Sequence, residues 1–191
     1  MKVYEYKNYE EYLESQVEAN VAKLKMVYVE KKTINKICED AKSATKILCH
    51  GTRNAAEQFY FKENFPNAEI IGTEVSHTAD KFPMTVQHDF NESKTEWVGQ
   101  FDIVYSNAFD HAFDPIKTIQ IWADQVKLGG KLYLEHGYGE EDNRARPWDP
   151  VEINDEELKQ LFKNVNLKLE RTFESTGLKG RVPCRVYVLT K

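Results

Sequence analysis

From residue 46 onward, short apolar runs rich in β-branched residues alternate along the chain with longer stretches of helical spacing. This alternation limits the possible folds more than any other feature, because it is typical of a doubly wound α/β sheet in which helices connect parallel strands. We predict five such strands, at about residues 46–50, 69–74, 84–88, 102–106 and 131–136.

The last part of the chain has a different pattern. Two further strands are expected at residues 167–175 and 184–190, separated by TGLKGRVP. A connection that contains glycine and proline is typical of antiparallel strands. The predicted fold is therefore α/β, with a doubly wound Rossmann-like seven-stranded sheet that is parallel except for a terminal antiparallel hairpin.

Two helices have recognisable ends. Asp114-Pro115 is an N-cap followed by proline at the first helical position, and Gly129-Gly130 is expected to end that helix. Asn154 and Glu157 form a capping-box pattern, which predicts a helix at about 155–164. The apolar positions of the first helix recur at helical spacing: Ile116, Ile119, Trp122 and Val126.

The first 45 residues contain no glycine or proline and predict two helices, broken near 26–32. We interpret residues 1–45 as an N-terminal helical cap and residues 46–191 as the Rossmann-like domain. Half of the ten tyrosines lie within the first 28 residues. Two explanations stay open: the cap packs on the sheet, or it folds over a cleft and lines an acceptor pocket.

Composition excludes several classes of protein. The chain has 26 basic and 31 acidic residues, a net charge of −5, which is the wrong sign for a general binder of nucleic acid. No apolar run approaches the ~18 residues of a membrane span, and the acidic, aromatic N-terminus does not resemble a secretory signal, so we expect a cytoplasmic protein. Three cysteines without a CxxC pattern predict reduced thiols: Cys38, Cys49 and Cys184.

In a doubly wound sheet the ligand lies beyond the carboxyl ends of the strands, so the residues that follow each strand are the candidates for chemistry. Gly51 follows the first strand and permits a tight turn, after which Asn54 and Glu57 are expected to act as helix cap and third-position partner. Glu74, 23 positions after Gly51, ends the second strand and can accept hydrogen bonds from a ribose diol. Asp89, after the third strand, can accept from the amino group of an adenine.

The fourth and fifth strand ends contribute polar side chains to the same edge. Ser106, Asn107, Asp110 and His111 follow the fourth strand, and His136 and Tyr138 follow the fifth. The five histidines show no HxxxH or HxH spacing, so we expect no metal. The acidic run at 140–142 is interpreted as a solvated loop rather than a magnesium site.

These segments together resemble the class I S-adenosylmethionine-dependent methyltransferases over about residues 46–190. The family has a glycine turn after the first strand, an acid at the end of the second, an Asp after the third and a closing antiparallel hairpin. FDIVYSNAFDH is similar to its fourth-strand region, and QVKLGGKLYLE to its xLKPGGxlxle stretch, with Leu128 in place of proline. The resemblance implies S-adenosylmethionine as cofactor and methyl transfer by in-line displacement.

The glycine loop departs from the family pattern. The usual ExGxGxG is CHGTRNA here, which keeps Gly51 but has Cys49, Arg53 and Ala55 at the other positions. This loop resembles a smaller subgroup with a GxRxG loop. Because S-adenosylmethionine has no phosphate but carries a carboxylate, we predict that the Arg53 guanidinium binds the methionine carboxylate.

The resemblance implies two sets of site residues. Asp110 and His111 are the candidates to orient or deprotonate the acceptor, which we expect to be a small molecule or a sugar-type compound. The 137–150 stretch is a second candidate for acceptor selection, through Arg144, Arg146 and Trp148. The implied cofactor-binding residues are Gly51, Thr52, Arg53, Glu74, Val75, Asp89, Phe90, Ser106 and Asn107.

Two other functions remain open at this point. A nicotinamide-dependent oxidoreductase shares the glycine turn and the acid at the second strand, although GTRNAA lacks GxGxxG and its Arg53 and Ala55 would crowd a pyrophosphate. A degenerate, non-catalytic binding module is the second alternative. A nucleic-acid substrate is not expected, because SNAFDH lacks the D/N-P-P-aromatic pattern.

Overall fold

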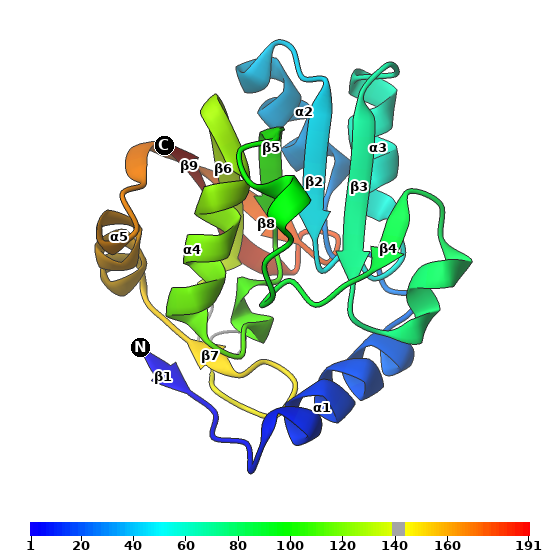
Figure 1. Ribbon diagram of the computed structural model, residues 1–191, viewed down its shortest axis with the longest axis vertical. Coiled ribbons are helices and arrows are strands. Elements are labelled where there is room, and N and C mark those ends of the chain that lie inside the picture. Colours follow the sequence, from blue (N-terminus) through cyan, green and yellow to red (C-terminus); the bar gives the residue numbers. More distant parts are fainter. Residues whose placement is uncertain (139–143) are drawn as a thin grey trace.

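The computed structural model describes residues 1–138 and 144–191. Its centre is a seven-stranded sheet with the strand order β4-β3-β2-β5-β6-β9-β8 (Figure 1). β9 runs antiparallel to both of its neighbours and the other pairs are parallel. The predicted fold is confirmed. The strands are β2 (Lys46–His50), β3 (Glu69–Glu74), β4 (Thr85–Gln87), β5 (Phe101–Ser106), β6 (Val126–Gly137), β8 (Lys168–Gly177) and β9 (Val182–Thr190).

Helices cover both faces of this sheet. Ile34 and Phe61, from α2 and α3, are buried in one core cluster, and Trp122 and Phe162, from α4 and α5, are buried in the other. Side chains alternate across a strand, so neighbouring residues of β2 enter different clusters. The helices are α1 (Tyr9–Ala22), α2 (Lys31–Ala41), α3 (Ala56–Asn64), α4 (Pro115–Gln125) and α5 (Asp155–Asn164).

The predicted end of the helix that starts at Pro115, which is α4, is wrong. α4 ends at Gln125, four residues before Gly129-Gly130, and β6 begins at Val126. The Gln100 N–H donates to the Gln125 carbonyl (3.1 Å), and Phe101 pairs with Val126 at the start of the sheet. Pairing with β5 therefore removes the last residues of the periodic pattern from the helix, and the two glycines lie inside an irregular part of the strand.

The two predicted N-terminal helices have different surroundings. α2 packs beside the sheet, whereas α1 lies across the edge toward which β2 and β3 point in Figure 1. A short ladder of β1 (Lys2–Val3) and β7 (Val151–Glu152) joins the N-terminus to the segment before α5. The division of the chain at residue 45 remains a prediction.

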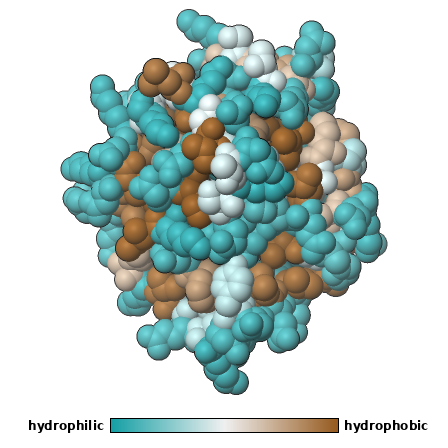
Figure 2. All heavy atoms as spheres, in the orientation of Figure 1, coloured by the Kyte–Doolittle hydropathy of each residue, from teal (hydrophilic) through white to brown (hydrophobic). Residues whose placement is uncertain are grey.

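The surface in Figure 2 is mostly hydrophilic, with separate hydrophobic patches between the polar residues. Within the described ranges, none of the helices is long and apolar enough to cross a membrane. All three cysteines are buried thiols.

Candidate functional site

A cavity of about 220 Å³ lies at the carboxyl ends of the strands, between the sheet and α1. Residues that follow β2, β3, β4 and β5 line one side of it, and residues of α1 line the other. Of the catalytic and cofactor-binding residues that the family resemblance implies, all except Ser106 are in its wall. Those that line it are Gly51, Thr52, Arg53, Glu74, Val75, Asp89, Phe90, Asn107, Asp110 and His111.

Ser106 has a structural position. It is fully buried, its Oγ donates to the His50 carbonyl (3.2 Å), and the same oxygen accepts from the Ala108 N–H (3.0 Å). Its bonds shape the turn after β5, so a direct contact between Ser106 and a ligand has no support from its position.

The turn after β2 requires glycine at its first position. Gly51 has φ +68°, and a Cβ there would lie 2.5 Å from the Cβ of Ala108. Thr52 closes the turn, with its N–H donating to the Thr73 carbonyl (3.0 Å). The loop therefore passes close to the chain that follows β5, and both contribute to the cavity wall.

The helix after this loop begins differently from the prediction. Ala55, with φ +63°, is the N-cap of α3, and no side chain caps the helix. Asn54 instead donates from Nδ2 to the carbonyls of Leu24 and Met26, both at 3.0 Å, and so ties the loop to the segment after α1. The expected roles of Asn54 and Glu57 as a capping pair are wrong, because the left-handed turn at Ala55 starts the helix later.

Glu57 faces the cavity from the first turn of α3 and is almost completely buried. Burial raises the pKa of its carboxyl group to about 7, and nearby Glu135 adds to the effect. Its Oε2 and the Nδ2 of Asn107 in the same wall make no hydrogen bond of good geometry among the described residues, but the Asn107 side chain lies close enough to Glu57 to lower its pKa. Our prediction that Glu57 is only a cap missed this position, since alternation and capping patterns carry no information about a cavity.

Glu74 occupies the end of β3 as predicted. Its Oε2 accepts from the Arg53 N–H (3.1 Å) and its Oε1 from the Ser76 N–H (3.0 Å). Burial raises the pKa of Glu74, while these two N–H groups and the Arg53 charge act in the opposite sense. The loops after β2 and β3 thus hold a carboxylate at the cavity wall.

Asp89 lies farther along the same edge, after β4. Its Oδ1 accepts from the Asn91 N–H (2.8 Å) and Nδ2 (2.6 Å), and its other oxygen accepts from the Tyr9 hydroxyl. A tyrosine of the cap therefore binds the carboxylate that we predicted to contact an adenine.

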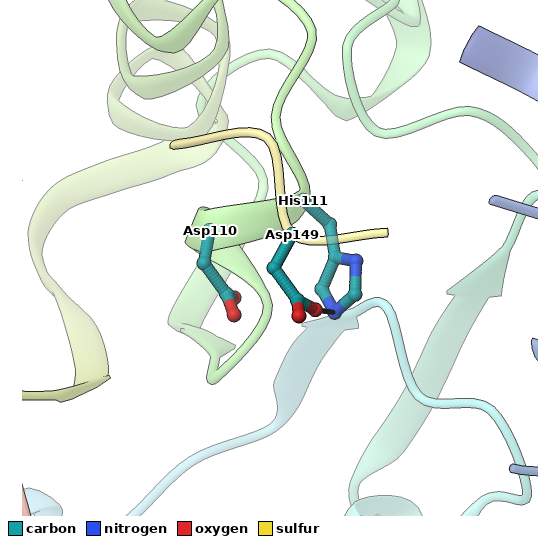
Figure 3. A group of neighbouring side chains, drawn as sticks. All are labelled: Asp110, His111 and Asp149. Atoms are coloured by element: carbon teal, nitrogen blue, oxygen red, sulfur yellow. Dashed lines mark ion pairs between the residues drawn. The ribbon is translucent and has the colours of Figure 1, made fainter. Parts of the chain in front are cut away.

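Asp110, His111 and Asp149 form a cluster on the opposite part of the wall, with side chains that point to the same side (Figure 3). One ligand atom of each lies within 4.8 Å of the others. His111 Nδ1 is 2.8 Å from Gln16 Oε1, and its Nε2 is 3.6 Å from Asp149 Oδ1. Asp110 has no hydrogen-bond or ion-pair partner in the described part of the chain.

Positive charges surround Asp149. Lys23 Nζ lies 3.7 Å from its Oδ1 and Arg146 Nε 2.5 Å from its Oδ2. Burial alone would raise the pKa of Asp149, but His111, Lys23 and Arg146 together hold it below its usual value. Two cations already at this carboxylate oppose a metal ion, so we assign none to the cluster.

Sequence reasoning missed part of the site. Tyr12, Gln16 and Asn20 of α1 line the cavity, which fits the second explanation for the tyrosine-rich cap. Their spacing of four residues puts them on one helix face, a signal that a search for an unpartnered polar face could have used.

The 137–150 stretch contributes to the site in part. Arg146 and Asp149 line the cavity, whereas Arg144 and Trp148 do not, and Trp148 instead lies 5.3 Å from the Lys23 ammonium. The acidic run of Glu140, Glu141 and Asp142 lies outside the described residues. At the fifth strand end His136 lines the cavity, while the Tyr138 hydroxyl donates to Glu174 (2.8 Å) on the surface.

Comparisons with known proteins identify the fold. No protein-family model matches the chain, and no curated protein matches it by sequence. A solved structure of 1,6-didemethyltoxoflavin-N1-methyltransferase from Burkholderia thailandensis, with its named substrate and S-adenosylhomocysteine bound, has a TM-score of 0.75 at 12% identity, over 98% of this chain and 92% of that one. The [4+2]-cyclase SpnF has a TM-score of 0.69 at 10% identity, over 93% of both chains.

A third structure, mitomycin 7-O-methyltransferase MmcR, has a TM-score of 0.61 at 14% identity over 84% of this chain. The match covers 54% of that longer chain. The shared fold is that of class I S-adenosylmethionine-dependent methyltransferases, and the cyclase shows that the same fold also serves another reaction.

Proposed function

We propose that this protein transfers the methyl group of S-adenosylmethionine to a small-molecule acceptor. The observation that carries the proposal is the convergence of Glu74, Asp89 and Arg53 on one cavity, at the carboxyl edge of a sheet with the class I methyltransferase order. Ligands of doubly wound sheets bind at this edge. The resemblance of the glycine loop to the GxRxG subgroup remains part of the proposal.

The described residues provide complementary groups for such a cofactor. Glu74 can accept hydrogen bonds from ribose hydroxyls through the lone pairs that Arg53 and Ser76 leave free. Asp89 can accept from the adenine amino group once the Tyr9 hydroxyl shares or leaves its oxygen. The Arg53 guanidinium, half-buried in the wall, suits the methionine carboxylate. When bound, the cofactor supplies an already activated sulfonium methyl group.

The acceptor side of the proposal involves Asp110 and His111. Both ring nitrogens of His111 face oxygen atoms, from Gln16 and Asp149, so the orientation of this ring is fixed by its neighbours. Asp110 is the carboxylate left open to the cavity, and we assign to it the orientation or deprotonation of the acceptor. Alignment of the reactants then supplies most of the rate enhancement, up to about 7–11 kcal/mol in favourable cases.

Small molecules are also the substrates named for related folds, such as 1,6-didemethyltoxoflavin. A sugar-type acceptor has no further support. The order of the first five strands, β4-β3-β2-β5-β6, is the one that dinucleotide-binding domains also have. The antiparallel β9 inserted between β6 and β8 is absent from their 3-2-1-4-5-6 order, and this difference counts against the oxidoreductase alternative.

Titration calorimetry with S-adenosylhomocysteine and with NADH tests the proposal. We expect S-adenosylhomocysteine to bind and NADH not to bind, and Arg53→Ala to weaken the binding of S-adenosylhomocysteine. Binding of NADH alone would establish the oxidoreductase alternative. A folded protein that binds neither compound would instead be the non-catalytic module.

The role of Asp110 has a separate test once an acceptor is found. Asp110→Asn should lower kcat, while His111→Ala should mainly raise KM for the acceptor. An unaltered pH-rate profile in both variants would remove both residues from the mechanism.

A further inference from the structure

One end of the cavity wall is built by residues that lie far apart in the sequence. Tyr28 follows α1, His136 and Gly137 end β6, and Leu178 lies between β8 and β9. The Leu178 N–H donates to the Tyr28 carbonyl (2.9 Å), and the Tyr28 hydroxyl lies 3.4 Å from Cys184 Sγ. Cys184 pairs with Gly137 across β9 and β6. These contacts bring the three parts of the chain together at one place in the wall.

Asp110 lies at the same end of the cavity. Burial raises the pKa of the Tyr28 hydroxyl, Cys184 adds to the rise, and the negative charge of Asp110 adds to it further. Burial lowers the pKa of His136, and the charge of Asp110 opposes that shift. The Asp110 carboxylate, the Tyr28 ring and the His136 imidazole are therefore neighbours.

The Asp110 carboxylate is the unpaired charge at this end. The cations of the adjacent cluster, Lys23 and Arg146, both pair with Asp149 instead. Figure 3 marks an ion pair from His111 to Asp149 and none to Asp110. Within the described ranges no basic side chain pairs with Asp110, and the few residues outside those ranges include no basic one. A carboxylate that has no counter-ion in the protein attracts a cationic group of a ligand.

His136 contributes a second acceptor. Its Nε2 lies 3.4 Å from the Ile153 carbonyl, and because a carbonyl oxygen only accepts, this nitrogen carries the proton of the ring. Nδ1 then has a lone pair, and it makes no hydrogen bond among the residues that the structure describes. Burial lowers the pKa of His136, so the ring is neutral at pH 7. A ligand that binds both acceptors needs hydrogen-bond donors.

The rest of this end is aromatic and aliphatic. The Tyr28 ring packs on Gly177, where a Cβ would lie 2.5 Å from the ring, so this glycine makes room for it. Met26 and Leu178 add aliphatic side chains to the wall. An aromatic ring face and a carboxylate both attract positive charge, so the combination favours an ammonium group over a hydroxyl group.

We propose that Asp110, Tyr28 and His136 form the acceptor subsite and that it binds the ammonium group of an apolar amine. The inference rests on the proposed function, because it names the class of the methyl acceptor. The ammonium group donates to the Asp110 carboxylate and to Nδ1 of His136, and the apolar part of the amine lies against Met26 and Leu178. An anionic acceptor is disfavoured, because it would meet the unpaired carboxylate without a cation to offset the repulsion.

Three matched probes test the inference. Phenethylamine, phenethyl alcohol and phenylpropionate carry an ammonium, a hydroxyl or a carboxylate group on the same framework. Calorimetry measures each compound on the full chain saturated with S-adenosylhomocysteine. We expect phenethylamine to bind about tenfold or more tightly than the alcohol, and phenylpropionate to bind more weakly than the alcohol. Equal affinities, tightest binding of phenylpropionate, or no binding of phenethylamine would overturn the amine class.

Two variants locate the preference, and a third is the matched control. Asp110→Asn removes the charge at nearly constant shape and should lower the affinity for phenethylamine about tenfold. Tyr28→Leu keeps an apolar side chain without the ring and should lower it several-fold. Asp124→Asn makes the same change at a carboxylate outside the cavity wall and should leave all three affinities at their wild-type values. Binding of S-adenosylhomocysteine shows that each variant is folded.

The outcomes separate this inference from the function on which it rests. If S-adenosylhomocysteine binds and Asp110→Asn leaves the preference for phenethylamine intact, the acceptor subsite is wrong and the cofactor assignment stands. The same holds if Asp110→Asn weakens S-adenosylmethionine more than S-adenosylhomocysteine while the probes do not differ, because Asp110 then balances the sulfonium charge. If S-adenosylhomocysteine does not bind the wild-type protein, the proposed function fails and the acceptor class fails with it.

Discussion

At the scale of single residues, the loop after β2 shows how close packing of two backbone segments makes glycine necessary at one position. Gly51, Arg53 and Ala55 all have positive φ, yet only Gly51 also lacks room for a Cβ. Residues with a Cβ tolerate the left-handed region at a cost of roughly 1–2 kcal/mol. The contact with Ala108 therefore explains why glycine is needed at the first position and not at the other two.

We predict that Gly51→Ala lowers the free energy of unfolding by about 2–4 kcal/mol, from backbone strain and overpacking together. Gly180→Ala is the matched control, because Gly180 has φ +83° and a methyl group added to it would meet no atom within 4 Å. It should lose only about 1–2 kcal/mol. Equal losses in urea denaturation of the two variants would show that the contact with Ala108 does not matter.

Glu57 makes stability depend on pH in the ligand-free protein. Its folded pKa of about 7 lies above the usual 4.5, so the folded state keeps a proton that the unfolded state has lost between these values. Stability must therefore fall as pH rises from about 4.5 to about 7, and stay lower above that range. At 1.36 kcal/mol per pH unit the total is about 3 kcal/mol.

We predict that Glu57→Gln removes this loss. Denaturation at pH 5 should give similar stabilities for the variant and the wild type, and at pH 8 the variant should be more stable by about 2–3 kcal/mol. If the difference between the two proteins does not change with pH, Glu57 is ionised throughout and the raised pKa is wrong.

At the scale of elements, local signals and tertiary contacts compete at each helix end. The capping box of Asn154 and Glu157 starts α5 where the sequence predicts it, with the two reciprocal bonds at 3.0 Å. At the end of α4 the local signal is overruled, because Val126 gains a place in the β5–β6 ladder. A helix cap depends only on hydrogen bonds within the first turn of the helix. The end of α4 depends instead on pairing with a distant strand, which extends β6 into residues that the local pattern assigns to the helix.

Substitutions of two N-cap asparagines test how α5 and α1 each contribute to stability and to ligand binding. Asn154→Ala should lower the free energy of unfolding by about 1 kcal/mol and leave the binding of S-adenosylhomocysteine unchanged, because α5 is outside the cavity wall. Asn8→Ala removes the equivalent bond to the Glu11 N–H in α1 and should weaken that binding by several-fold, because α1 lines the cavity. Calorimetry measures the binding of both variants and urea denaturation their stability. Equal effects of the two substitutions on binding would mean that α1 is not part of the ligand site.

At the scale of the whole molecule, α1 closes the carboxyl edge of the sheet. The Tyr12 hydroxyl donates to the His111 carbonyl (3.0 Å), and the Thr78 hydroxyl donates to Asn20 Oδ1 (2.7 Å). α1 thus contacts the chain after β3 and the chain after β5 at the same time. A ligand of the size we propose must contact both walls, and its binding should stabilise the molecule as one unit.

We predict that S-adenosylhomocysteine at 100 times its Kd raises the free energy of unfolding by about 2.7 kcal/mol. For a chain of this length the corresponding rise in Tm is about 5–10 °C. Thermal denaturation followed by circular dichroism measures it, with NADH at the same concentration as the control. A Tm that neither compound changes would contradict the proposed function.

The strand pattern of the chain is enough to predict the sheet, because the signals for strands and turns are local and recur along the sequence. β2 and β3 coincide with the predicted strands, the antiparallel hairpin follows from TGLKGRVP, and the strand ends indicate Glu74 and Asp89 as wall residues. Apolar alternation, glycine turns and caps are properties of neighbouring residues, so a single sequence is enough to locate them.

Contacts between residues far apart in the sequence could be found only in the folded molecule. Gln16 reaches His111 across 95 positions of the sequence, Tyr9 reaches Asp89 across 80, and Glu57 enters the wall because Ala55 starts its helix late. No periodic pattern encodes such contacts, since they depend on where α1 packs across the sheet edge. Burial and the loss of hydration raise the pKa of Glu57, and both exist only after the chain has folded.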